Sequence, residues 1–120
     1  MKDFPVILVA EDEAIIGHDL RDTVEEAGYI VEGPHPDVNS AMRAAQENRP
    51  DLAILDVALG NEVVYPLAER LMAEQVPVIF HSGQIAREDM LARFPHVRAV
   101  EKPCPPADML ENVAEALARA

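Results

Sequence analysis

Short apolar runs rich in β-branched residues recur along this chain, and a stretch with helical spacing lies between each run and the next. The first run, Phe4–Ala10, reads FPVILVA. The others, in chain order, are Tyr29–Glu32, Leu52–Leu55, Val76–Phe80 and Val97–Val100. Runs that are mostly apolar, without strict alternation, are typical of parallel strands that are covered on both faces. The pattern therefore predicts a parallel sheet between two layers of helices.

The stretches between these runs predict five helices. In the first, Ile16, Leu20 and Val24 recur at helical spacing, and Gly28 supplies a C-terminal stop. Asp37 is the expected N-cap of the second. The second to fifth helices are expected over Val38–Ala45, around Leu67–Leu71, over Ile85–Phe94, and over Met109–Leu117 with Pro105 and Pro106 near its first turn. Five strands and five helices in 120 residues predict an α/β fold with a doubly wound five-stranded parallel sheet, order 2-1-3-4-5, as in flavodoxin-like proteins. We expect one domain over residues 1–120.

Charge and cysteine content exclude several classes of function. Ten Lys and Arg against 22 Asp and Glu give a formal charge of −12, which repels phosphate backbones and argues against nucleic-acid binding. No apolar run approaches the ~20 residues of a membrane helix, and the N-terminal segment lacks the design of a signal peptide. A single cysteine, Cys104, allows no internal disulfide. We therefore expect a cytoplasmic domain that has no contact with a membrane.

Charged and hydroxyl side chains gather where the predicted strands end. Glu11 and Asp12 follow the first run, Asp56 follows the third, and Ser82 and Lys102 follow the fourth and fifth. The carboxyl ends of neighbouring parallel strands meet at one edge of the sheet, so we expect these side chains to share one pocket. Several carboxylates in one cleft need a compensating cation, for which Mg²⁺ is suited, and the lysine adds a second positive charge. A carboxylate held there can act as a nucleophile towards a phosphoryl group, which indicates a metal-assisted phosphoacceptor site.

Four segments at these positions carry a family resemblance: VILVAEDE, RPDLAILD, VIFHSG and VEKP. Together and in this order they resemble the receiver domain of two-component response regulators. The resemblance implies that Asp56 is the phosphoacceptor and a Mg²⁺ ligand. It further implies that Asp12 binds Mg²⁺ directly, that Glu11 holds it through water, and that the backbone carbonyl of Ala58 is another ligand.

The same resemblance assigns the groups around the phosphate. Ser82 would take a phosphoryl oxygen and Lys102 would pair with the phosphate, while Val57 and Gly83 would lie beside it. The bond between Lys102 and Pro103 is often cis in this family. The phosphoryl donor would be a histidine kinase or a histidine phosphotransfer protein. The chain would be a phosphoacceptor switch that assists its own phosphorylation and dephosphorylation but is no enzyme in the usual sense. It would be a monomer or a weak dimer.

The chain departs from the family's pattern at several positions. Glu11 replaces the commoner Asp, and the loop after Asp56 lacks the usual Pro and Asp-Gly turn, as in a subgroup of short bacterial receivers. Ile85 stands where that subgroup often carries an aromatic residue. Ala99 stands where most receivers have the Tyr or Phe that couples to the hydroxyl. Our hypothesis is that the signal leaves through backbone shifts of the loop after the fourth strand and of the fourth helix.

Two other functions would also fit parts of this pattern. A phosphorylation-independent protein-interaction module on the same fold is supported only by Ala99, because Asp12, Asp56 and Lys102 are all present. A metal phosphatase that turns over small substrates usually places a second acid two residues after its nucleophile, where this chain has Ala58.

The histidines and the cysteine are interpreted as having no role in the chemistry. We expect His18 to face solvent and His35 and His96 to lie in loops, without metal-ligand spacing to Cys104. Alternation along the strand would turn His81 away from the neighbouring hydroxyl, so packing or surface exposure is the expectation for it.

Overall fold

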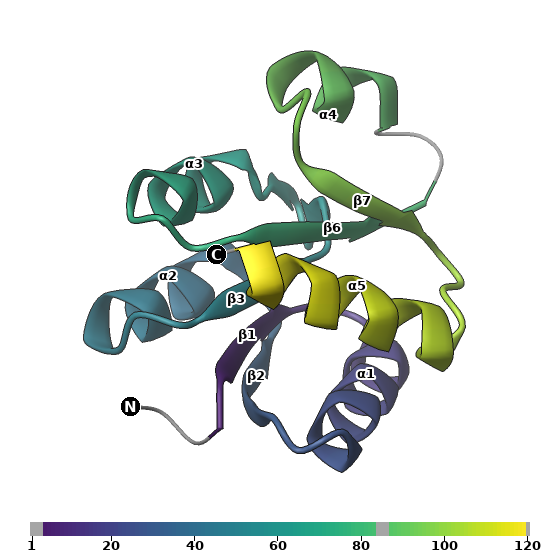
Figure 1. Ribbon diagram of the computed structural model, residues 1–120. Helices are drawn as coiled ribbons and strands as arrows, with labels where there is room; N and C mark the ends of the chain where they lie inside the picture. The colour runs from purple at the N-terminus through teal and green to yellow at the C-terminus, as the bar shows by residue number, and fades with distance from the viewer. Residues whose placement is uncertain (1–3, 84–86, 120) are drawn as a thin grey trace.

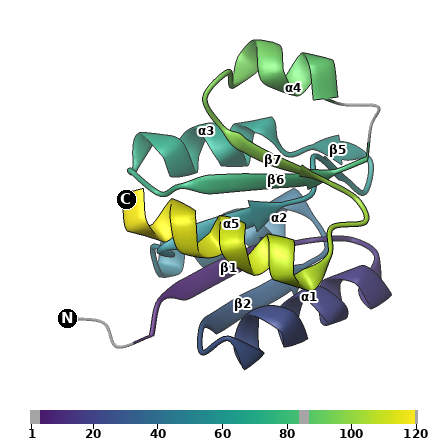
Figure 2. The same cartoon turned by 45° about the vertical axis from the view of Figure 1, so that its right-hand side comes forward.

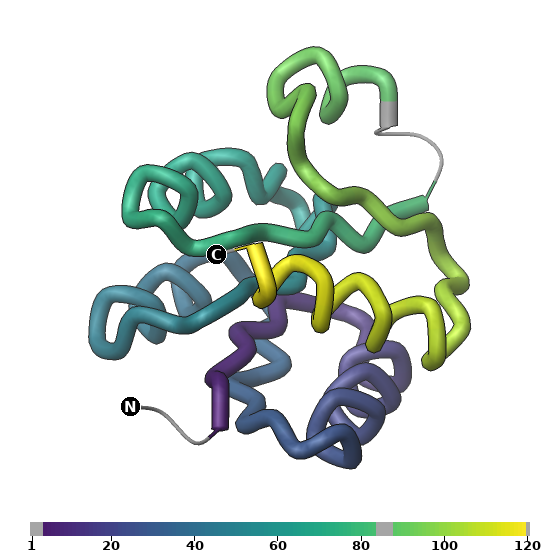
Figure 3. Tube along the Cα trace, in the orientation of Figure 1, coloured from purple at the N-terminus to yellow at the C-terminus, as the bar shows by residue number. Residues whose placement is uncertain are grey.

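The five strands expected from the apolar runs form one parallel sheet. The computed structural model describes residues 4–83 and 87–119. Its sheet strands are β1 (Val6–Ala10), β2 (Ile30–His35), β3 (Leu52–Leu55), β6 (Val78–Ser82) and β7 (Arg98–Glu101). They lie in the order β2-β1-β3-β6-β7, which is 2-1-3-4-5 for these five strands and confirms the prediction. The chain can be followed in Figure 3 from β1 out to the β2 edge and back to β3.

Helices cover both faces of the sheet. They are α1 (Ala14–Glu26), α2 (Val38–Glu47), α3 (Tyr65–Ala73), α4 (Arg87–Arg93) and α5 (Pro106–Arg119). Helices α1 and α5 lie on one face, and α2 and α3 lie on the other (Figures 1 and 2). Helix α4 lies beyond the β7 edge (Figure 1). Met90, which lies in α4, and Phe94, which directly follows the helix, join the core on the α2–α3 side.

Alternation along the strands divides the core into two clusters and fixes where the strand ends point. In β1, Ile7 and Val9 pack with α1 and α5, whereas Leu8 and Ala10 pack with α2 and α3. In β6, Ile79 belongs to the α1–α5 cluster and Phe80 to the other. Because successive side chains of a strand point to opposite faces, the next two residues of β6 follow the same rule. His81 therefore faces α1 and α5, and Ser82 faces the opposite side.

The predicted N-cap of α2, the predicted glycine stop of α1 and the predicted cis bond before Pro103 are all present in the structure. Asp37 caps α2, since its Oδ1 accepts a hydrogen bond of 2.7 Å from the Ser40 N–H. Gly28 has φ +100° just after α1, a conformation that favours glycine. The bond between Lys102 and Pro103 is cis, as is the bond between Gly33 and Pro34.

Several boundaries differ from the predictions. Strand β6 begins at Val78, after Pro77, and continues to Ser82. Strand β2 continues to His35, so the expectation that this histidine lies in a loop was wrong. A proline inside β2 is tolerated because β2 is an edge strand, and for the same reason β2 is only partly buried. The predicted start of the fourth helix at Ile85 lies outside the described residues.

A small hairpin after Asp56 was not expected from the sequence. Strands β4 (Ala58–Leu59) and β5 (Glu62–Val63) pair antiparallel around the two residues Gly60 and Asn61. Gly60 has φ +64°, which suits such a turn. The hairpin lies beside the carboxyl end of β3, where the predicted site residues gather. Across the described part of the chain, none of the helices has the length and apolar character needed to cross a bilayer.

Candidate functional site

Three carboxylates meet where β1 and β3 end. The two strands are neighbours with Ala10 paired to Leu55, so the residues that follow them come together. The Asp56 N–H donates to the Ala10 carbonyl over 3.0 Å, which fixes this edge of the sheet. One carboxylate oxygen from each of Glu11, Asp12 and Asp56 lies within 4.8 Å of the others. Glu11 and Asp56 are only 3% and 7% exposed, whereas Asp12 is open to solvent.

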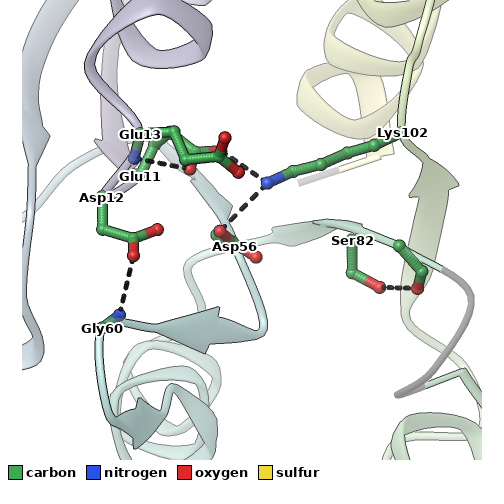
Figure 4. A network of polar contacts seen from close by, with 8 residues as sticks. Glu11, Asp12, Glu13, Asp56, Gly60, Ser82 and Lys102 are labelled. Atoms are coloured by element: carbon green, nitrogen blue, oxygen red, sulfur yellow. Dashed lines mark hydrogen bonds and ion pairs between the residues drawn. The ribbon is translucent and has the colours of Figure 1, made fainter.

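Lys102 reaches this cluster from the end of β7. Its Nζ lies 2.9 Å from Glu11 Oε1 and donates a hydrogen bond of 3.0 Å to Asp56 Oδ2 (Figure 4). The backbone holds the lysine in place, because its N–H donates to the Ser82 carbonyl over 2.8 Å. The predicted convergence of Glu11, Asp12, Asp56 and Lys102 is therefore present in the structure.

The cluster has unusual proton affinities. Burial raises the pKa of Asp56 to about 7, with the hydrogen bond from Lys102 acting against the rise and the charge of Glu11 adding to it. Burial disfavours the charge of Lys102, but its contacts with Glu11 and Asp56 outweigh this and leave the pKa of the lysine above its usual value. One lysine thus only partly balances the carboxylates, and the site favours a further cation.

The donor set suits a hard divalent cation. All three side chains offer oxygen, the ligand type that Mg²⁺ prefers, and the exposed position of Asp12 leaves the cluster open to hydrated ions. Asp12 Oδ2 also accepts a hydrogen bond of 3.2 Å from the Gly60 N–H, which ties the hairpin to the cluster. Sequence reasoning missed Gly60, although a Gly-Asn pair is a recognised hairpin-turn signal.

The backbone carbonyl of Ala58 points away from the neighbouring strand β5. Val57 accepts a hydrogen bond of 2.9 Å from the Val64 N–H. Hydrogen-bonded and non-hydrogen-bonded pairs alternate in an antiparallel ladder, so the next pair, Ala58 with Val63, directs its backbone groups outward. The Val57 side chain is buried in the core, so any contact of this residue with a ligand must come from its backbone.

Ser82 is near the cluster but its hydroxyl is turned away from it. The Oγ donates to the Gly83 carbonyl over 2.8 Å (Figure 4). On the same side, Ser82, Met90 and Ala99 line a cavity of only about 10 Å³. Ala99 therefore leaves no large void, because the side chain of Met90 from α4 is fully buried beside it. Among the residues that the structure describes, none has an atom within 4 Å of a Cβ placed on Gly83, so their packing does not require glycine at that position.

Comparison with known proteins gives the family. The response regulator receiver domain matches residues 7–114 of this chain. This chain belongs to the response regulator receiver domain family. The receiver domain of a modulated diguanylate cyclase from Desulfovibrio desulfuricans G20 is 27% identical with a TM-score of 0.85, over 98% of this chain and 96% of that one. A response regulator receiver protein from Sinorhizobium medicae has the same fold, with a TM-score of 0.86 at 23% identity over 97% and 96% of the two chains.

Curated relatives are longer than this receiver. The transcriptional regulatory protein PdtaR of Mycobacterium tuberculosis is 28% identical over 116 residues, which cover 94% of this chain and 57% of that protein. The transcriptional regulatory protein RprY of Bacteroides fragilis is 31% identical over 90 residues, 73% of this chain and 38% of RprY. The chain thus spans little more than half the length of PdtaR and less than half the length of RprY. Receiver domains accept phosphoryl groups from histidine kinases, and the acidic cluster of this receiver is typical of their phosphoacceptor site and supports a role in two-component signalling.

Proposed function

We propose that this receiver accepts a phosphoryl group on Asp56 from the phosphohistidine of a histidine kinase or a histidine phosphotransfer protein, in the presence of Mg²⁺. The observation that carries the proposal is the position of Asp56, 3.0 Å from Lys102 and within 4.8 Å of Glu11 and Asp12. A nucleophile held between a cation and a metal-binding carboxylate pair is the arrangement that phosphoryl transfer requires.

Each residue of the site has a separate role in this proposed transfer. An Asp56 carboxylate oxygen attacks phosphorus as the phosphorus–nitrogen bond of phosphohistidine breaks, and the imidazole leaves with the bonding electrons and takes up a proton. The product is an acyl phosphate on Asp56. Lys102 neutralises a phosphoryl oxygen, and Glu11, Asp12, Asp56 and the Ala58 carbonyl would hold Mg²⁺. When bound, the metal supplies positive charge to the phosphoryl oxygens.

The backbone around the acceptor completes the phosphate site. Ser82 exchanges its hydrogen bond to the Gly83 carbonyl for one to a phosphoryl oxygen, and the Gly83 and Val57 backbones lie beside the phosphate. Hydrolysis of the acyl phosphate by water returns the receiver to its starting state. Asp56 is followed two residues later by Ala58, which carries no acid or base to speed that hydrolysis.

The output of the switch is expected on the β6–α4 side. Ala99 has no ring that can turn inward, so the change at Ser82 has to pass to the backbone at Gly83 and to Met90, which shares the small cavity with Ser82. If a phosphoryl mimic left the NMR shifts of β6 and α4 unchanged while another face moved, this route would be wrong.

The test of the acceptor is incubation with acetyl phosphate or a phosphorylated histidine phosphotransfer protein, with and without Mg²⁺, followed by intact mass. We expect one added phosphoryl group that requires Mg²⁺ and is absent in Asp56→Asn. Asp22→Asn, which changes an exposed carboxylate of α1, is the matched control and should accept normally. No adduct from either donor, together with no Mg²⁺ binding, would reject the phosphoacceptor and leave the protein-interaction module.

A further inference from the structure

Helix α4 is joined to the rest of the receiver by a small aromatic cluster. The helix lies beyond the β7 edge of the sheet (Figure 1), and Phe94 directly follows it. The ring centroid of Phe94 lies 5.3 Å from that of Tyr65 and 5.4 Å from that of Phe80. Tyr65 and Phe80 are 6.0 Å apart in an edge-on arrangement. These three rings connect α3, β6 and the end of α4.

Polar residues of α4 also lie against Tyr65. The guanidinium carbon of Arg93 lies 4.9 Å from the centroid of the Tyr65 ring, and its Nη2 is 3.6 Å from Glu69, one turn further along α3. Asp89 precedes Arg93 by one turn of α4, so both side chains project from the same face of that helix. Burial, followed by the charge of Asp89, raises the pKa of Tyr65, as expected for a carboxylate close to the hydroxyl. Two turns of α4 therefore face this tyrosine.

The hydroxyl of Tyr65 is buried without a hydrogen bond. The residue is 4% exposed, and in the described part of the chain its oxygen has no hydrogen-bond partner. A buried hydroxyl that makes no hydrogen bond is costly, and a carboxylate is a strong acceptor for it. Because Asp89 belongs to a helix at the margin of the fold, a small shift of α4 would be enough to form this bond.

Tyr65 is also close to the phosphoacceptor along the backbone. Val57 directly follows Asp56, and its carbonyl accepts a hydrogen bond of 2.9 Å from the N–H of Val64, the residue before Tyr65. The turn of the intervening hairpin is itself hydrogen-bonded to the acidic cluster. A change at Asp56 can therefore reach the start of α3 through one backbone hydrogen bond.

We propose that Tyr65 is a positioning residue that couples Asp56 to α4, and that its hydroxyl pairs with the Asp89 carboxylate when Asp56 is phosphorylated. The inference rests on the proposed function, because phosphorylation of Asp56 is the signal that moves the helix. It also gives an aromatic route to a chain with Ala99 in β7, since Phe80 pairs with Ala99 across the strands and packs on Tyr65. One hydrogen bond from a hydroxyl to a carboxylate shifts a two-state equilibrium about ten- to a hundredfold.

The coupling is tested on the whole chain by backbone amide NMR of α4, with beryllium fluoride and Mg²⁺ as the phosphoryl mimic. Tyr65→Phe keeps the ring and removes only the hydroxyl. Tyr29→Phe makes the same change at the other tyrosine and is the matched control. We expect wild type and Tyr29→Phe to give the full shift of the α4 amides. In Tyr65→Phe the equilibrium constant for the shifted position of α4 should be at least about tenfold lower.

Substitutions at Asp89 separate this coupling from simple packing. Asp89→Asn keeps an acceptor for the hydroxyl, whereas Asp89→Ala removes it. Glu88→Ala removes the neighbouring exposed carboxylate of α4 and is the control. We expect the asparagine variant to keep most of the α4 response and the alanine variant to lose as much as Tyr65→Phe. Tyr65→Phe combined with Asp89→Ala should lose no more than either change alone.

Intact mass after incubation with acetyl phosphate and Mg²⁺, measured on the same variants, keeps this inference apart from the proposed function. An equal adduct with an unchanged α4 response in Tyr65→Phe would overturn the coupling and leave the phosphoacceptor in place. A wild-type chain with neither an adduct nor a response to beryllium fluoride would reject both. If Tyr65→Phe did not fold, the exposed position of Asp89 would still allow its two variants to decide the question.

Discussion

Replacing Asp56 by Asn should stabilise this receiver when no metal is present. The wild-type carboxyl has a pKa of about 7 in the folded chain against an ordinary value of 3.8. A difference of about three pKa units, at about 1.36 kcal/mol per unit, gives about 4 kcal/mol as an upper limit for the cost of ionising Asp56 in the fold. Because relaxation of the fold and water penetration lower the cost of a buried charge, and Lys102 lies beside it, we expect a gain of about 2 kcal/mol at pH 8.

The sign of this effect depends on pH. Below pH 4 the carboxyl is protonated in both the folded and the unfolded chain, so it contributes no penalty. Between pH 4 and 7 the folded chain binds the proton and the unfolded chain has lost it, so the wild-type free energy of unfolding falls as pH rises. Above pH 7 both states are ionised and the difference is constant. The gain from Asp56→Asn should therefore grow from pH 5 to pH 7 and level off by pH 8.

Urea unfolding followed by far-UV circular dichroism, in EDTA at pH 5, 6, 7 and 8, measures this gain. Asp22→Asn removes an exposed carboxylate and should show no such trend. Added Mg²⁺ should stabilise the wild-type chain by mass action and leave Asp56→Asn nearly unchanged. A gain that is the same at pH 5 and pH 8, or a loss of stability in EDTA at pH 8, would refute the reasoning about Asp56.

Three further predictions concern the same edge of the sheet and its support. Because Mg²⁺ must displace a proton from Asp56 below pH 7, its apparent dissociation constant should rise by up to about tenfold for each pH unit below 7; calorimetry at pH 5.5, 6.5 and 7.5 checks this, and a flat affinity contradicts it. Lys102→Met leaves Glu11 and Asp56 without their cation and should cost about 1–3 kcal/mol in EDTA; an unchanged urea midpoint contradicts it. Gly33→Ala should cost about 3 kcal/mol, since φ is +123° and the new Cβ would clash with the Val9 carbonyl oxygen. Gly60→Ala, with φ +64° and no described atom within 4 Å of the new Cβ, should cost about 1 kcal/mol, and equal thermal shifts of these two variants would show that the close contact at Gly33 is unimportant.

The sheet and the acidic cluster could be predicted because each depends on a strong local signal. Apolar runs such as Leu52–Leu55 have few other stable environments than a strand covered on both faces. Once the strand order is known, the residues after β1, β3 and β7 have to meet at one edge, so the approach of Asp56 and Lys102 follows from topology. The division of β6 between two cores likewise follows from alternation, and it predicted that His81 turns away from Ser82.

Features that depend on a few tertiary contacts could not be predicted in the same way. Strands β4 and β5 have two residues each, too few to show periodicity, and they form because the Gly60 turn closes them and ties them to Asp12. The rotamer of Ser82 is decided by its bond to the Gly83 carbonyl rather than by sequence. The cavity of about 450 Å³ between α1, α5 and the segment after β7 depends on how these three elements are placed, which no local pattern describes.

The hydrogen bond of Ser82 limits how strong the proposed switch can be. A bond from a hydroxyl to a charged phosphoryl oxygen is worth about 1.5–3 kcal/mol, against about 1 kcal/mol for the present bond to the Gly83 carbonyl. The difference, about 0.5–2 kcal/mol, shifts a two-state equilibrium only about two- to thirtyfold. In receivers with an aromatic residue at the position of Ala99, burial of the ring adds to this shift, whereas here nothing at that position can. A complete switch in this chain therefore needs a second differential contact, and Lys102 is placed to give it, because its Nζ lies 3.0 Å from Asp56 Oδ2 and would pair with a phosphate on that residue. Lys102→Met should accordingly weaken the response of β6 and α4 to a phosphoryl mimic, while an unchanged NMR response would assign the remaining free energy to another contact.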